Sequence, residues 1–179
     1  MIAELITTLD VGGAENVAIA LAERCNTHVN RAFVVEVYRS RSAYADQMRS
    51  TLSRRGLCHK TLSFRSKRFA LIEAPFRLAR WIAQEKPQVI HSHTDLPDFV
   101  LSLAVRLLKL SGIRQPLIVR TIHNVELWPT HRWLGRITET GLKDDAVIAV
   151  SRAALQAYHE LRRRYRLSTA PTVKVIYNG

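Results

Sequence analysis

The chain alternates between short apolar stretches typical of strands and longer segments with apolar residues at helical spacing. Residues 31–38 are rich in β-branched and aromatic side chains, as expected of a buried strand. The next segment, residues 42–56, is amphipathic with a helical period and closes at Gly56, a usual residue just past a helix end. Because this alternation continues along the chain, strands and helices are expected to follow one another in turn.

Strands are predicted at residues 2–9, 31–38, 57–64, 87–94, 116–124, 145–151 and 172–179. Helices are predicted at residues 14–25, 42–56, 69–86, 98–112, 131–142 and 152–165. Pro75 falls inside one of these helices, and we expect it to mark a kink or a later helix start. The alternation predicts an α/β fold: a Rossmann-like parallel sheet of about seven strands with helices on both faces.

Composition narrows the class of protein. The 179 residues, 47 % of them hydrophobic and 23 % charged, fit one globular domain. No apolar run reaches the roughly 18 residues that a membrane span needs, and the N-terminus lacks the pattern of a signal peptide. Cys25 and Cys58 form neither a disulfide framework nor a zinc pattern, so we expect a reducing, cytoplasmic location.

The formal net charge of +12 favours a partner that carries phosphate: nucleic acid, anionic lipid or a phosphorylated metabolite. Basic and aromatic residues interleave between residues 54 and 81, a pattern typical of helices that lie on an anionic membrane. The residues expected at the membrane are Arg65, Lys67, Arg68, Arg77, Arg80 and Trp81. A solvated helix face with the Phe and Trp side chains in the core is the alternative.

Ligands of open parallel sheets bind at the carboxyl ends of the strands. Gly12 and Gly13 stand there, after the first predicted strand. Two readings remain open: bare backbone that receives a phosphate at a helix start, or a left-handed turn with close helix–strand packing. The sequence around them is neither the dinucleotide fingerprint nor a P-loop.

Histidines and helix starts supply the other candidates at this edge. His91 and His93 alternate on one strand and therefore face one side of the sheet. A metal site with Asp95 and Asp98 is disfavoured because no third soft ligand is evident. We expect His91 to be a buried, hydrogen-bonded residue and His93 to touch ligand. His123, at a strand tip, suits proton handling or a neutral hydrogen bond to a sugar hydroxyl or phosphate.

Ser151 is expected to cap the helix that follows it, since no G-x-S-x-G surrounds it as it would a nucleophilic serine. That helix start would face the same cleft as the first glycine loop. The residues expected to contact substrate are Gly12, Gly13, His93, Thr94, Asn124, Glu126, Ser151 and Arg152.

The order of several stretches resembles the N-terminal domain of glycosyltransferase family 4. They are LDVGGAENVAIALAE, KPQVIHSHT, VRTIHN, DAVIAVSRAAL and the terminal VKVIYNG. The resemblance implies a retaining, metal-independent enzyme of the GT-B fold, built from two Rossmann-like domains. Residues 1–179 would be the acceptor-binding domain, and the C-terminal domain that binds the nucleotide sugar would be absent from this chain. The chain alone is then expected to be inactive or nearly so.

The same resemblance implies roles for single residues. Gly12 and Gly13 would approach the donor phosphate and the acceptor, and His123 would be the catalytic histidine near the reacting sugar. No cofactor or metal is expected besides the nucleotide sugar. The acceptor would be a glycan or a lipid-linked sugar of bacterial cell-surface polysaccharide or lipopolysaccharide synthesis, reached from the inner face of the cell membrane.

The basic charge also fits two other functions: a nucleic-acid-binding module and a non-catalytic module of the membrane surface. The sequence shows no RNP-like aromatic strand, zinc finger or basic zipper, so no nucleic-acid partner is expected.

Overall fold

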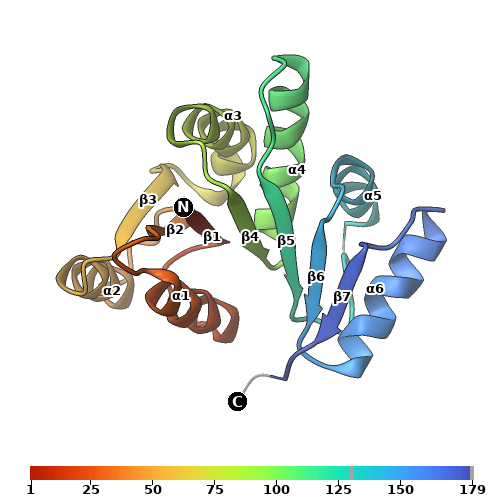
Figure 1. The fold of residues 1–179 in the computed structure, drawn as a ribbon, viewed down its shortest axis with the longest axis horizontal. Helices are drawn as coiled ribbons and strands as arrows, with labels where there is room; N and C mark the ends of the chain where they lie inside the picture. The colour runs from red at the N-terminus through yellow and green to blue at the C-terminus, as the bar shows by residue number, and fades with distance from the viewer. Residues whose placement is uncertain (130, 178–179) are drawn as a thin grey trace.

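A computed structural model describes residues 1–129 and 131–177, which form one parallel sheet in the order β3-β2-β1-β4-β5-β6-β7 (Figure 1). The strands are β1 (Ile2–Ile6), β2 (Ala32–Tyr38), β3 (Cys58–Ser63), β4 (Val89–His93), β5 (Leu117–Ile122), β6 (Ala146–Ala149) and β7 (Thr172–Val175). The helices are α1 (Gly13–Cys25), α2 (Ala43–Arg54), α3 (Lys67–Glu85), α4 (Asp95–Leu110), α5 (Arg132–Gly141) and α6 (Arg152–Arg164). The predicted Rossmann-like α/β class is confirmed.

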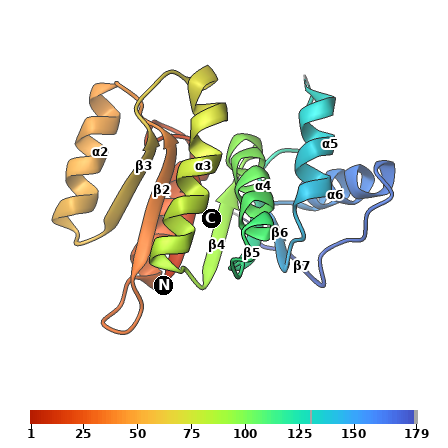
Figure 2. The same cartoon turned by 90° about the horizontal axis from the view of Figure 1, so that it is seen from above.

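Helices cover both faces of the sheet (Figures 1 and 2). On one face, Ala18 and Ala22 of α1 pack with Ile6 of β1. On the other, α3 and α4 bury their apolar sides against residues such as Leu5 of β1 and Ile90 of β4. The strand order reverses between β1 and β4, so the edge beyond these two strands is the topological switch point where such folds bind ligands.

Helix α3 corrects two expectations. It begins at Lys67 and continues past Pro75, so a late start at the proline is wrong. Trp81 is wrong as a membrane contact, because its side chain is only 5 % exposed and packs edge-on against Phe33 with 5.5 Å between ring centroids. Trp81 lies three residues after the buried Leu78, and this helical spacing places it on the stripe that faces the sheet.

The ends of several elements agree with their sequence signals. Gly56 has a φ of +69° just past α2, as expected for a glycine that closes a helix. The last predicted strand is shorter than expected and ends at Val175; residues 178 and 179 of that prediction lie outside the described residues. Within the described part of the chain, every helix is too short or too polar to cross a bilayer.

Candidate functional site

The carboxyl edge of the sheet gathers the loops that carry the candidate residues. Gly12 follows β1, Thr94 follows β4, His123 follows β5 and Ser151 follows β6, and these strands neighbour one another in that order. Two side-chain contacts tie the edge together: the Thr7 and Thr94 hydroxyl oxygens lie 3.2 Å apart, and the rings of His93 and His123 touch. The candidates therefore share one edge of the molecule and are not scattered over several faces.

The glycine pair has no role in a left-handed turn. Gly12 is extended, with a φ of −168°, and a Cβ added at Gly13 would meet no atom within 4 Å. The reading as a tight turn with close helix–strand packing is therefore wrong. A Cβ at Gly12 would collide with the carboxylate of Glu15, which lies over this start of α1. Asp10 anchors the loop by accepting hydrogen bonds from the Ser40 and Ser42 hydroxyls.

Thr94 holds an unusual backbone conformation at the switch point. Its φ is +75°, which a β-branched residue rarely adopts. Such a conformation costs on the order of 1–3 kcal/mol and persists where the surrounding structure enforces it, commonly at ligand sites. Thr94 is the residue before α4, so this strained backbone lies directly at the start of that helix, at the carboxyl edge of the sheet.

A row of buried polar side chains runs inward from His123. One carboxylate oxygen of Glu4 lies 2.7 Å from Nε2 of His93 and 3.0 Å from Nδ1 of His91. His91 Nε2 lies 2.7 Å from the Thr121 hydroxyl, and His93 Nδ1 lies 3.3 Å from His123 Nε2. His91 is buried and hydrogen-bonded, as expected. His93 is buried as well, so the expectation that it touches ligand directly needs correction: it reaches the edge through His123.

The ionisation of this row follows from burial and its hydrogen bonds. Burial, helped by the nearby His93 and His91 rings, lowers the pKa of His123 to about 4. Burial also lowers the pKa of His93, although the hydrogen bond to Glu4 opposes this. Burial would raise the pKa of Glu4, but the hydrogen bonds from His91 and His93 outweigh it and lower that pKa. At neutral pH Glu4 is therefore a carboxylate, while His93 and His123 are neutral.

Glu4, His91 and His93 also bring potential metal ligands within 4.8 Å of one another in the described residues. Their geometry is already accounted for, because the carboxylate accepts a hydrogen bond from each imidazole. Asp98 does not join them. One of its oxygens accepts two hydrogen bonds from Arg120, at 2.8 and 2.9 Å.

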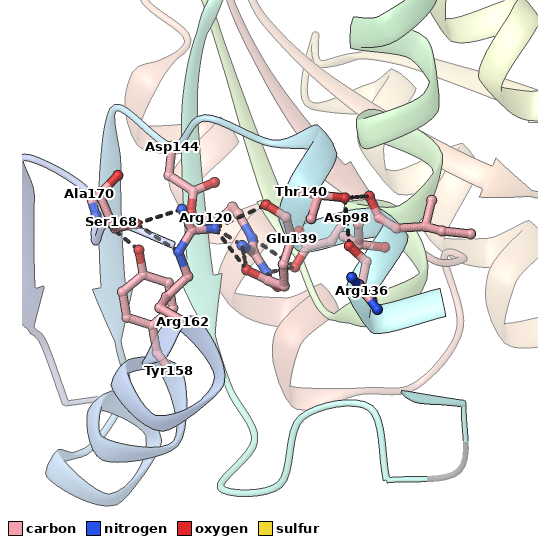
Figure 3. A network of polar contacts seen from close by, with 12 residues as sticks. Asp98, Arg120, Arg136, Glu139, Thr140, Asp144, Tyr158, Arg162, Ser168 and Ala170 are labelled. Carbon is pink, nitrogen blue, oxygen red and sulfur yellow. Dashed lines mark hydrogen bonds and ion pairs between the residues drawn. The ribbon is translucent and has the colours of Figure 1, made fainter. Parts of the chain in front are cut away.

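A second polar network lies on the opposite face, where α4, α5 and α6 meet β5 (Figure 3). The buried Arg120 guanidinium donates to Asp98, Glu139 and Asp144. Arg162 of α6 donates to Glu139 as well, at 3.2 Å. Burial raises the pKa of Asp98 to about 7, against the opposing effect of Arg120. This network fixes α4, α5 and α6 against the sheet, and no local sequence pattern predicts it.

A groove of about 660 Å³ lies between α3, α4 and α5. Its lining is almost entirely apolar and includes Leu71, Phe76, Leu103, Trp133 and Leu134. Ile72 and Phe76 lie one turn apart on α3 and are exposed by 69 % and 61 %, and exposed apolar side chains grouped in this way are typical of interaction surfaces. We call this cavity the apolar groove.

The apolar groove adjoins a smaller pocket of about 280 Å³ at the first turns of α3 and α4, with Leu71, Phe99, His131 and Leu134 common to both linings. We call the smaller cavity the edge pocket, because α3 and α4 begin at the carboxyl ends of β3 and β4. Its polar lining comes from Lys67, Asp95 and His131. Trp128 lines it too, and its buried indole N–H has no hydrogen-bond partner among the described residues. Both cavities are thus lined mainly by apolar side chains, and the edge pocket adds the polar groups of Lys67, Asp95 and His131 at the edge of the sheet.

Most of the other candidate residues are exposed. Arg65, Lys67, Arg68, Arg77 and Arg80 are exposed on or just before α3. Asn124 and Glu126 are exposed in the loop after β5, and Arg152 is exposed at the start of α6. The Ser151 hydroxyl accepts a hydrogen bond from the Ala154 N–H at 3.1 Å, which confirms Ser151 as the cap of α6.

A parallel sheet in this order, with its helices and its glycine loop at the switch point, is the architecture of one Rossmann-like half of the GT-B glycosyltransferases. The chain belongs to Glycosyltransferase Family 4, whose sequence profile matches residues 11–179. A search of curated protein sequences found no match.

Solved structures show the same fold at low sequence identity. One is Alr3699/HepE of Anabaena in complex with UDP and glucose, at 19 % identity and a TM-score of 0.69, covering 99 % of this chain and 44 % of that one. Another is WaaB, a lipopolysaccharide outer core galactosyltransferase, at 14 % identity and a TM-score of 0.70. The match covers 99 % of this chain and 45 % of WaaB. A third is MurG of Acinetobacter baumannii, at 12 % identity and a TM-score of 0.58. The match covers 99 % of this chain and 46 % of MurG. The chain thus spans under half the length of these proteins.

Proposed function

We propose that the chain is the acceptor-binding half of a retaining glycosyltransferase that moves a sugar from a nucleotide sugar to a lipid-linked acceptor at an anionic membrane surface. Family membership supports sugar transfer. A place in bacterial cell-surface polysaccharide or lipopolysaccharide synthesis is supported by the likeness to WaaB, and a nucleotide-sugar donor by the UDP and glucose bound to Alr3699/HepE. The nucleotide sugar would be held mainly by a second domain outside residues 1–179.

The main support for a lipid-linked acceptor is that the apolar groove adjoins the edge pocket. An amphiphile would place its chain among apolar residues such as Ile72 and Phe76, and its polar head beside Lys67 and Asp95. The head would then lie at the edge of the sheet where a donor sugar would arrive. A water-soluble glycan acceptor would gain nothing from the apolar groove.

Cations around α3 support the membrane part of the proposal. Arg65, Lys67, Arg68, Arg77 and Arg80 are exposed on the helix that also exposes Ile72 and Phe76. Each cation near an anionic leaflet contributes about 1 kcal/mol of binding free energy. Exposed apolar side chains that enter the interface add to this attraction.

The mechanism rests on fixed dipoles. Backbone N–H groups at the starts of α1 and α6 would stabilise the leaving phosphate electrostatically and without a metal. The Glu15 carboxylate lies against Gly12, so we expect the phosphate to approach on the open side, at Gly13. His123 would orient the transferred sugar by a neutral hydrogen bond, and closure of the second domain would exclude water.

Flotation with vesicles of phosphatidylglycerol and phosphatidylcholine tests the membrane surface. The wild-type protein should float with anionic vesicles and be released at high salt. Ile72→Asp should abolish flotation, whereas Val29→Asp, at a residue 90 % exposed in the loop between α1 and β2, should not. Equal loss in both variants, or binding to oligonucleotides in place of vesicles, would contradict the proposal and favour the nucleic-acid module.

A further inference from the structure

The row from Glu4 to His123 has a direction that follows from its donors and acceptors. Glu4 is a buried carboxylate and can only accept hydrogen bonds, so Nε2 of His93, 2.7 Å away, carries a proton. His93 is neutral and therefore has no proton on Nδ1. This bare nitrogen faces Nε2 of His123 at 3.3 Å, so that Nε2 must carry the proton.

The proton on Nε2 of His123 also determines the state of its other ring nitrogen, at the outer end of the row. A neutral His123 with its proton on Nε2 has a bare Nδ1. No described residue hydrogen-bonds to that nitrogen, and the His123 ring is half-buried at the carboxyl edge of the sheet. His123 therefore offers the cleft a hydrogen-bond acceptor and no charge.

We propose that Glu4 and His93 are positioning residues that hold His123 in the Nε2–H tautomer, so that its Nδ1 accepts a hydrogen bond from a sugar hydroxyl. The assignment of a sugar hydroxyl as the donor to Nδ1 rests on the function proposed above. The consequence is specific: a phosphate or carboxylate offers no proton to a bare nitrogen, so the diphosphate of the donor binds elsewhere on the edge. His123 then recognises the sugar and not the leaving group.

The groups around the row agree with this assignment. His91 forms a side branch, because its Nδ1 faces Glu4 and its Nε2 faces the Thr121 hydroxyl. Thr121 pairs with His93 across β4 and β5, yet among the described residues its hydroxyl hydrogen-bonds only to His91. The branch supplies a second hydrogen bond to Glu4 and leaves the link between His93 and His123 unchanged.

Long-range proton–nitrogen NMR on histidine-labelled protein measures the tautomers directly, and no substrate is needed. The chain has seven histidines, few enough for assignment by single substitutions. At neutral pH, His93 and His123 should both show protonated Nε2 and bare Nδ1. A proton on Nδ1 of His123 in the wild-type protein would overturn the proposal, whatever any variant does.

Two substitutions distinguish the contribution of the row from that of the His91 branch. Glu4→Gln replaces the obligatory acceptor by an amide that can also donate, so His93 and His123 should change from one tautomer to a mixture of both. Thr121→Val removes the outer partner of His91 only, and His123 should keep its tautomer. Unchanged tautomers in folded Glu4→Gln protein would overturn the positioning role. Equimolar zinc should leave the His91 and His93 signals unmoved, and their displacement would identify a metal site instead.

In a protein that carries both domains, Glu4→Gln should lower kcat by at least about tenfold with a smaller change in KM, because the sugar still binds but is held less well. Wild-type kcat in that variant would overturn the proposal. If the tautomers are as stated but His123→Ala retains full turnover, the role in sugar transfer fails while the tautomer assignment stands. The two failures are therefore distinguishable.

Discussion

Arg120 on β5 donates two hydrogen bonds to one carboxylate oxygen of Asp98 on α4, at 2.8 and 2.9 Å, and both side chains are buried. Glu139 and Asp144 contact the same guanidinium. Removing this cation leaves carboxylates buried without compensation. We expect Arg120→Met to destabilise the fold by about 3–5 kcal/mol, measured by urea unfolding. Arg77→Met, which removes an exposed partner of Glu73, should cost at most about 1 kcal/mol.

If Arg120→Met were as mild as Arg77→Met, the network would not hold the helices against the sheet. Double substitution offers a further check. Asp98→Asn should weaken the fold less when Arg120 is already Met, since the two side chains interact directly.

Substitution of Gly13 by alanine is expected to preserve or raise stability but to lower activity. The position of Gly13 in α1 has open space around it and no positive φ, so Gly13→Ala should leave stability unchanged or raise it by about 0.4–1 kcal/mol. The added methyl group should nevertheless block ligand at the helix start and lower sugar transfer by a protein with both domains.

Gly56→Ala is the matched control. Gly56 also has open space around it, but its φ is +69°, so the substitution should destabilise the fold by about 1–2 kcal/mol without changing the specific activity of folded protein. A Gly13→Ala variant that is fully active would remove the bare backbone from the proposed site.

Trp81 and Phe76 lie on the same helix with opposite exposures, 5 % and 61 %. Trp81→Ala should destabilise the fold by about 3–5 kcal/mol because it empties a packed position beside Phe33. Phe76→Ala should change stability little and reduce flotation with anionic vesicles. If Phe76→Ala floats as well as the wild-type protein, the apolar groove is not a lipid-facing surface.

Acid should weaken the fold through His123. Its pKa is about 4 in the folded protein, against an ordinary value of 6.5, so between these values the unfolded chain takes up a proton that the folded protein does not. Stability should therefore fall as pH falls from 6.5 to 4, and the contribution of this group should level off below 4. His123→Gln should show a shallower decline in urea midpoints over the same range, and parallel curves would contradict this.

Periodicity and strand-end reasoning predicted much of this molecule, because they depend on local chemistry. Ser151 was recognised as a helix cap from its neighbours alone, and the sheet edge follows from parallel strands. Trp81 was misplaced because its helix carries aromatic residues on both sides, and only packing against Phe33 shows which side is buried.

The buried polar groups were harder to foresee, because their partners lie far apart in the sequence. Glu4 and His93 are separated by 89 positions, and Arg120 and Glu139 by 19. A signal for each does exist: Glu4 and Arg120 are charged residues inside otherwise apolar strands, where a charge needs a partner. Which partner each takes depends on strand order and register, which the sequence pattern alone did not supply.

Sugar transfer in a protein that carries both domains tests the central claim most directly. Labelled sugar from nucleotide-sugar donors should enter the lipid fraction of bacterial membranes with the wild-type protein, and EDTA should not prevent it. His123→Ala should lower that transfer by about 10²-fold or more while its thermal midpoint stays near that of the wild type. Transfer by His123→Ala at the wild-type rate, or no transfer by the wild-type protein from any donor tried, would contradict the account.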